Sequence, residues 1–229
     1  MRKIVIMLVA LSLVLTLTAC AQTQEGTSST LQDSSSAGWR ILTFDSIEDF
    51  MAFMERTDFD KKGFFSDYGG PFEDGYYETY YMLRADKFYY VPRLNAENVK
   101  KVKAYIQPGG FIGFEYYIGD DENPSLTIRL LTSKQDKLTD GKGSLQSAVE
   151  ERYKGFAPNV TFSPYTVRGN SGVISSSNEI FLAIDDEYIA DMRGSPLPRE
   201  NSGDMLDYKY DGAAPKYAEM VTFERVSLK

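Results

Sequence analysis

The sequence contains no histidine, and Cys20 is its single cysteine. One cysteine cannot form a disulfide within the chain, so the fold has to be stabilised by its apolar core. Zinc sites of the Cys₄ or histidine-containing type are excluded, and so is Ser-His-Asp or Cys-His catalysis. An enzyme of this composition would have to use carboxylates, lysine, tyrosine or a metal bound by oxygen atoms.

The sequence also lacks an uncharged apolar run long enough to cross a membrane. A spanning helix needs about 20 apolar residues, whereas the amino-terminal run Ile4–Leu17 has 14 and contains Ser12 and Thr16. Arg2 and Lys3 precede this run and small residues follow it. This order is typical of a cleaved export signal, which we expect to occupy residues 1–19.

The string Leu17-Thr18-Ala19-Cys20 ends the signal segment and resembles the lipobox of bacterial lipoprotein precursors. The resemblance covers residues 1–20 only. It implies cleavage before Cys20, a diacylglycerol thioether on Cys20 and often an acylated new amino terminus. Because two acyl chains hold a protein on a bilayer stably, the resemblance implies a lipid-anchored protein facing the extracytoplasmic side of the cell membrane. The alternative is an ordinary signal peptide with an incidental cysteine.

Basic residues are too few for a phosphate-binding role. The chain has 25 Lys and Arg against 33 Asp and Glu, a net charge of −8. Loss of Arg2 and Lys3 with the signal segment would leave 23 basic and 33 acidic residues, a net charge of −10. A nucleic-acid partner is therefore not expected, and docking of the domain itself on anionic lipid is disfavoured. We expect the bilayer to be contacted through the Cys20 anchor.

Residues 20–38 follow the signal segment and are small and polar, with one leucine. Such a segment buries too little apolar area to offset its ordering entropy, so we expect a flexible tether. Residues 39–229 are predicted to form one α+β domain, with an antiparallel sheet or sheets and two principal helices packed on it.

Two segments have helical periodicity. Ile47, Phe50, Met51 and Met54 fall on one helical face after Ser46, which is placed as a cap. The second predicted helix is Ser144–Lys154, ended by Gly155. A single helical turn is expected at Asn95–Lys100.

Most of the remaining sequence has strand patterns. Residues 111–118 and 126–130 alternate around a Gly119–Pro124 turn, which predicts an antiparallel hairpin. The segment Gly194–Lys216 is predicted to be a long loop. The other expected strands are 40–44, 77–84, 88–92, 102–107, 160–167, 173–177, 180–184, 188–192 and 220–226.

A tandem duplication is an alternative description of the domain. Each half has an amphipathic helix, then strands, then a hairpin with the acidic string Asp120-Asp121-Glu122 or Asp185-Asp186-Glu187. Antiparallel hairpins naturally reuse acidic turns, so coincidence is the simpler explanation of the echo.

Tyrosines are crowded between residues 76 and 117. Consecutive strand residues face opposite sides, so one ring of each pair should turn to solvent or to a neighbouring element. An exposed tyrosine has a flat apolar ring with a polar tip, which suits contact with a protein or a cell-wall glycan. The alternative is that tyrosine simply favours strands. The candidate binding residues are Tyr77, Tyr80, Tyr81, Tyr89 and Tyr90.

The acidic strings are the other candidates for chemistry. They lack the EF-hand pattern, so we expect solvated turns and no metal site. No phosphate loop, nucleophile elbow or dinucleotide motif is present, and no cofactor is expected. The sequence favours a non-enzymatic binding domain. The alternatives are a carboxylate-dependent hydrolase of envelope polymers, which needs two carboxyl groups across a cleft, and an envelope assembly or structural accessory.

Overall fold

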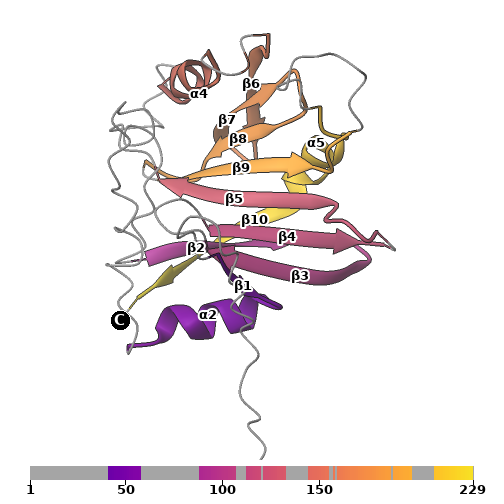
Figure 1. The fold of residues 1–229 in the computed structure, drawn as a ribbon. Coiled ribbons are helices and arrows are strands. Elements are labelled where there is room, and N and C mark those ends of the chain that lie inside the picture. Colours follow the sequence, from indigo (N-terminus) through magenta and orange to yellow (C-terminus); the bar gives the residue numbers. More distant parts are fainter. Residues whose placement is uncertain are drawn as a thin grey trace, which may run out of the picture.

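The computed structural model describes residues 41–57, 88–106, 112–119, 121–132, 144–154, 157, 159–186, 188–197 and 209–228. These residues form a mainly β fold in which every strand pairing is antiparallel. Eight strands make one sheet in the order β1-β3-β4-β5-β9-β8-β7-β6 (Figure 1). Their bounds are β1 Leu42–Phe44, β3 Val99–Ile106, β4 Ile112–Ile118, β5 Leu126–Thr132, β6 Phe162–Val167, β7 Asn170–Ser175, β8 Ile180–Ala183 and β9 Tyr188–Gly194.

A separate two-stranded ribbon covers one face of this sheet. It pairs β2 (Phe88–Leu94) with β10 (Val221–Ser227). The hydroxyl of Tyr116 on β4 donates to the Pro92 carbonyl of the ribbon over 2.6 Å. Because both sides of β2 are covered, Tyr89, Tyr90 and Val91 are all buried.

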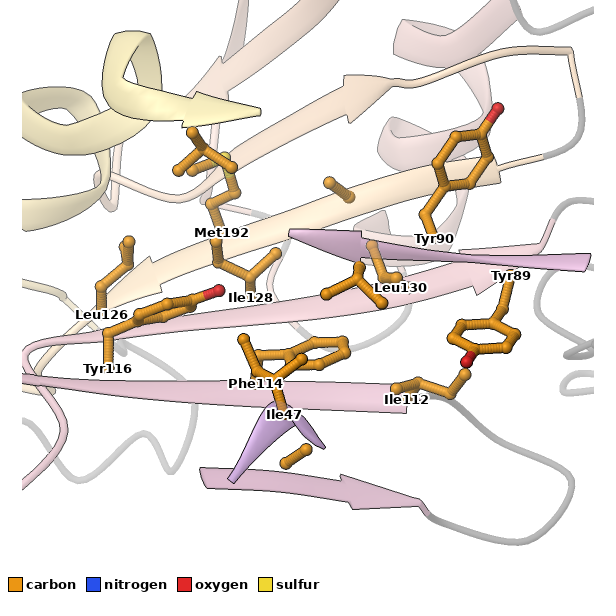
Figure 2. Close-up of a cluster of buried hydrophobic side chains, with 14 of the residues drawn as sticks. Ile47, Tyr89, Tyr90, Ile112, Phe114, Tyr116, Leu126, Ile128, Leu130 and Met192 are labelled. Carbon is orange, nitrogen blue, oxygen red and sulfur yellow. The ribbon is translucent and has the colours of Figure 1, made fainter. Parts of the chain in front are cut away.

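Alternation along the strands divides the core into two clusters on opposite faces of the sheet. On β5, Ile128 and Leu130 belong to the larger cluster and Leu131 to the smaller one. We call the face with Ile128 the first face and the face with Leu131 the second face. Figure 2 shows Phe114, Ile128 and Leu130 of the first face between the sheet and the ribbon.

The helix α2 (Ile47–Glu55) packs on the first face, as its apolar periodicity predicts. Its buried residues Ile47, Phe50 and Met54 belong to the larger cluster. The Ser46 hydroxyl accepts a hydrogen bond of 3.0 Å from the Asp49 amide, which confirms the predicted amino-terminal cap.

The helix α4 (Ser144–Lys154) has the predicted bounds and packs on the second face. Leu145, Val149 and Tyr153 join Phe181 and Ile189 of the sheet in the smaller cluster. Figure 1 places α4 beside β6 and β7 and α2 beside β1 and β3, at opposite ends of the sheet.

The predicted antiparallel sheet is confirmed. The described fold is mainly β, however, and its helices are short, so two principal helices packed on a sheet overstates its helical content. A further short helix, α5 (Ala213–Tyr217), begins within the predicted long loop, and a 3₁₀ turn at Ala218–Met220 begins just after it. The predicted helical turn at Asn95–Lys100 is wrong. Asn98 adopts a left-handed conformation (φ 63°) in a turn, and β3 begins at Val99. The predicted strand 77–84 lies outside the described residues.

The strand order has an internal symmetry that the helices do not share. The runs β1-β3-β4-β5 and β6-β7-β8-β9 meet through their last strands, and Arg129 is directly opposite Asp191 at the centre. A two-fold axis between antiparallel neighbours keeps each side chain on its own face. Since α2 and α4 lie on opposite faces, this axis does not relate the two helices, and the duplication of helix plus sheet stays a prediction.

Candidate functional site

A cluster of charged residues is buried at the centre of the second face. We call it the buried polar cluster: Arg129 of β5, Asp191 and Arg193 of β9, Glu179 just before β8, and Tyr153 of α4. Asp191 is 0% exposed and Glu179 is 2% exposed. Burying charge is costly unless the charges are paired and hydrogen-bonded, so these contacts have to be specific.

Strand register brings Arg129 and Asp191 together. They are cross-strand partners on β5 and β9, and an Arg129 Nη2 donates to Asp191 Oδ2. Arg193 lies two residues along β9 on the same face, and its Nε donates to Asp191 Oδ1 over 3.0 Å. Both oxygens of the buried aspartate therefore accept from an arginine.

Glu179 completes the cluster from the neighbouring strand. Its Oε1 forms an ion pair with Arg193, and its Oε2 accepts a hydrogen bond from the Tyr153 hydroxyl. Arg129 Nη2 lies 3.9 Å from Oε1. The backbone amide of Glu179 donates to the Ser175 hydroxyl over 3.0 Å, which fixes the start of β8.

Glu179 and Asp191 form a buried acid pair, and this arrangement favours uptake of a proton by Glu179. Burial raises the pKa of Glu179 to about 7, and the nearby negative charge of Asp191 raises it as well, while Arg193 opposes the change. The pKa of Tyr153 is also raised, first by burial and then by the charge of Glu179. The Tyr153 hydroxyl consequently stays protonated as a donor, and Glu179 is the cluster member that changes charge near neutral pH.

Tyr210 closes the cluster on the β9 side. Arg193 Nη1 donates to the Tyr210 hydroxyl over 3.2 Å, and the guanidinium lies 5.6 Å from the centre of the Tyr210 ring. The Asn178 side chain donates to the Tyr210 carbonyl over 3.0 Å and anchors this segment to the turn before Glu179. These bonds connect the start of β8, the end of β9 and the segment before α5.

Beyond the cluster, the second face of β3, β4 and β5 presents aromatic and charged side chains. We call this surface the open face: Lys101, Lys103, Tyr105, Glu115, Tyr117 and Thr127. Lys101 is exposed and the other five are half-buried. Of the described helices, α2 and α5 belong to the first face and α4 packs over β6 and β7, so none of them lies over Lys101, Lys103 or Tyr117.

Glycine 113 allows the open face to adjoin the buried polar cluster. A Cβ atom at this position would lie 2.0 Å from Cζ of Tyr105, so the Tyr105 ring lies across the bare backbone of Gly113. Gly113 is the cross-strand neighbour of both Tyr105 and Arg129. The ring is therefore directed from β3 toward the cluster.

At the other edge of the open face, Tyr117 lies among charged side chains. Its hydroxyl donates to Glu115 Oε2 over 3.0 Å, and Lys103 Nζ lies 5.8 Å from the ring centre. Lys101 is its cross-strand partner on β3. Burial and the bonded Glu115 carboxylate raise the Tyr117 pKa to about 12.

The predicted tyrosine site is only partly within the described residues. Tyr89 turns its ring to Phe50 of α2 at 5.4 Å, and Tyr90 turns its ring to Tyr188 at 5.2 Å. Both are therefore directed to neighbouring elements and buried, so this pair presents no binding surface. Tyr77, Tyr80 and Tyr81 lie outside the described residues, as does Cys20, and their roles stay predictions.

The acidic turn that contains Asp121 is adjacent to two pockets, but its carboxylate is bonded within the turn. Pockets of about 550 and 390 Å³ share Asp121 and Asp211 as lining residues. Asp121 accepts from the Ser125 hydroxyl over 2.7 Å, and Asp211 accepts from the Ala213 amide over 3.0 Å. Among the described residues, no three acidic side chains are grouped closely enough to hold a metal ion.

The described part of the chain also contains no helix that is both long and apolar enough to cross a membrane. Comparison with protein-family models, with curated proteins and with solved structures finds no match. The functional assignment therefore depends on the residues themselves.

Sequence reasoning missed the buried polar cluster. The available signal was Asp191 within the otherwise small and apolar string Ile189-Ala190-Asp191-Met192. A charge at that point in a central strand needs a partner. The partner, Arg129, is 62 residues away and could not be identified without the β5–β9 register.

Proposed function

We propose that this chain is a lipid-anchored, extracytoplasmic binding protein that contacts an envelope glycan through its open face. The single observation that carries this proposal is the juxtaposition of Tyr117 with Lys101, Lys103 and Glu115 on strands β3 and β4. Aromatic rings pack against the apolar faces of sugars, and charged groups beside them bind hydroxyl groups. Tyr105 and Thr127 extend the same surface toward the cluster.

Rigidity of the surface supports a binding role. Strands β3, β4 and β5 are backed by the larger apolar cluster, whose members Phe114 and Ile128 are 0% exposed. A site on such strands keeps its side chains in place before the ligand arrives, which lowers the entropy cost of binding.

The anchor is supported by the sequence Leu17-Thr18-Ala19-Cys20. Its test is the mass of the protein purified from membranes. We expect loss of residues 1–19 and addition of acyl groups at Cys20, and a Cys20→Ala variant should carry no lipid. Cleavage elsewhere, or an unmodified Cys20 thiol, would contradict the anchor.

The binding proposal is tested by sedimentation with insoluble cell-wall material. Tyr117→Ser should reduce the bound fraction of the full-length protein in neutral detergent. Tyr165→Ser is the matched control, because Tyr165 is also a half-buried strand tyrosine but packs against the larger cluster. Equal sedimentation of wild type and both variants would remove the open face from the proposal, and no sedimentation would favour the assembly accessory.

A hydrolase of envelope polymers is the second candidate, and the acid pair of Glu179 and Asp191 favours it. A carboxyl group with a pKa near 7 is suited to general acid catalysis. However, the two groups are 2% and 0% exposed, so a polymer has no route to them in this conformation. Release of soluble sugar by wild type, abolished in Glu179→Gln, would establish the hydrolase instead.

A further inference from the structure

We propose that Glu179 and Asp191 bind one shared proton, and that release of this proton loosens the packing of α4 on the second face. The buried polar cluster is then a proton-operated latch for this helix. The latch involves only the cluster and α4, so it does not depend on glycan binding at the open face.

One oxygen of the acid pair lacks a hydrogen-bond donor. Nε of Arg193 carries a single hydrogen. It donates this hydrogen to Asp191 Oδ1 over 3.0 Å, and the same nitrogen is in ion-pair contact with Glu179 Oε1. Within the described part of the chain, Glu179 Oε1 is buried and accepts no hydrogen bond. Two carboxylate oxygens therefore lie against one arginine nitrogen that can donate to only one of them.

A proton between the two carboxyl groups supplies the missing donor. Two carboxylates that share a buried site do not both ionise freely, because each negative charge disfavours the other. The carboxyl groups of Glu179 and Asp191 lie within hydrogen-bonding reach of each other. Asp191 keeps its charge, since its two oxygens accept from Arg129 and Arg193. The proton therefore belongs on Glu179, which donates it to Asp191.

The groups around Glu179 favour its protonated form. Burial and the charge of Asp191 raise the pKa of Glu179 to about 7, and they outweigh Arg193 and the Tyr153 hydrogen bond, which lower it. Burial raises the pKa of Tyr153 and of Tyr210, so both hydroxyls stay protonated. The titratable and charged groups on the elements packed around Glu179 are Arg129 on β5, Asp191 and Arg193 on β9, Tyr153 on α4, Tyr210 before α5 and, beyond Arg129, Tyr105 on β3.

The Tyr153 side chain connects the acid pair to α4. Its hydroxyl donates to Glu179 Oε2, which ties the carboxyl-terminal end of α4 to the residue before β8. Its ring centre lies 5.0 Å from that of Phe162 and 5.8 Å from that of Phe181. Since Tyr153 covers a carboxyl group that is 2% exposed, movement of α4 would admit water to Glu179.

Of the elements around Glu179, α4 is the one that can move without breaking the sheet. Strands β5, β8 and β9 are each paired on both sides. The segment with Tyr210 is held by backbone hydrogen bonds, from its own amide to the Ser177 carbonyl and from the Leu197 amide to the Lys209 carbonyl. A helix forms its backbone hydrogen bonds within itself, and α4 lies at the β6 end of the sheet (Figure 1). Local opening is therefore expected at α4 first.

Opening of α4 and ionisation of Glu179 are linked. A hydrated glutamate has a pKa of about 4.3, whereas the pKa of Glu179 under α4 is about 7. The closed form binds more protons between these values, so closure is favoured at low pH and is lost as the pH rises toward 7. With full hydration in the open form, the opening equilibrium constant should rise roughly 80-fold from pH 5 to pH 8.

The shared proton is tested by infrared spectroscopy of the full-length protein in neutral detergent, because protonated and ionised carboxyl groups absorb at different frequencies. Between pH 6 and 8, the wild type should lose close to one more carboxylic-acid equivalent than Glu179→Gln. Glu115→Gln is the matched control, since it removes a glutamate from the same face outside the cluster, and its loss should equal that of the wild type. Equal losses in the wild type and Glu179→Gln would overturn the shared proton.

Movement of α4 is tested by hydrogen exchange at pH 5, 6, 7 and 8, corrected for the intrinsic pH dependence of amide exchange. Protection of the α4 amides should fall by up to roughly 80-fold in the wild type over this range. It should stay level in Glu179→Gln, whose neutral side chain imitates the protonated form. The opening should also depend less on denaturant than global unfolding does, because it is local. Exchange of α4 only with the full denaturant dependence of global unfolding would overturn the latch.

The link through Tyr153 has its own variant. Tyr153→Phe keeps the ring and removes the hydroxyl, so it should raise the opening constant of α4 roughly tenfold at pH 8, where the bond is to an ionised carboxylate. Tyr165→Phe is the matched control, because Tyr165 is a strand tyrosine packed against the larger cluster on the first face. It should leave α4 exchange unchanged. An unchanged opening constant in Tyr153→Phe, or an equal increase in both variants, would overturn the assigned link.

Discussion

The two faces of strands β5 and β9 use the same backbone for opposite chemistry. On the first face, Ile128, Leu130 and Met192 are fully buried against apolar neighbours. On the second face, alternate residues of the same strands are Arg129, Asp191 and Arg193. A buried ion cluster is weak evidence for stability, since apolar residues of similar volume often serve as well or better. The difference suggests that the second face carries chemistry that the fold alone does not require.

Removal of one buried charge from the second face should change the free energy of unfolding more than any other substitution considered below. Asp191→Ala leaves two arginines beside a single carboxylate, and we expect the free energy of unfolding to fall by about 3–5 kcal/mol. Chemical denaturation at pH 7 measures it. The paired replacement Arg129→Met with Asp191→Leu should restore stability to within about 1 kcal/mol of the wild type or above it. If the double variant is as unstable as the single one, the cluster is needed for folding and the contrast between the faces is lost.

The next largest effect should be a pH dependence of stability, which we expect the second face to produce through Glu179. The pKa of Glu179 is about 7 in the folded chain and about 4.3 for an unfolded glutamate, so the folded state holds more protons between these values. The free energy of unfolding should therefore fall as the pH rises from about 4.3 to about 7 through this group.

The matched variant is Glu179→Gln, which keeps the neutral form. Its stability should vary less over that range and should exceed that of the wild type at pH 8. Denaturation curves at pH 5, 6, 7 and 8 provide the comparison. Parallel profiles for the two proteins would show that Glu179 does not titrate in this window.

A smaller effect should come from the helix that covers the first face. Ser46→Ala removes the hydroxyl that accepts from the Asp49 amide, and we expect a loss of about 1 kcal/mol. Ser46→Asp, another good capping residue, should retain most of the stability. Sedimentation with cell-wall material should be unchanged in both, because α2 packs on the face opposite the open face.

The sequence predicted local elements well and distant pairings poorly. Periodicity alone located α2 and α4, because their apolar spacing and caps lie within a few residues of each other. The Gly119–Pro124 turn predicted the β4–β5 hairpin for the same reason, and Gly119 does adopt a positive φ of 71°. The α5 helix was missed because it is only five residues long and lies within a segment rich in Pro, Gly and Asp.

The candidate site was harder to predict than the fold. Alternation predicted that one ring of the Tyr89 and Tyr90 pair would turn to solvent or to a neighbouring element. The ribbon position of β2 covers both sides of this strand, so both rings are buried. Tyr105 and Tyr117 were noticed only as part of the tyrosine crowding. Their membership of one surface depends on the register of β3 with β4 and on Gly113. The buried polar cluster depends on the non-local pairing of β5 with β9.

The most direct test of the account is the location of glycan contacts by backbone amide NMR. Titration of the protein with a soluble fragment of the cell-wall glycan should shift the amides of β3 and β4 around Lys101, Lys103, Glu115 and Tyr117, while those of α2 and the β2–β10 ribbon stay in place. Shifts confined to the first face, or to the pockets beside Asp121 and Asp211, would contradict the assignment of the open face.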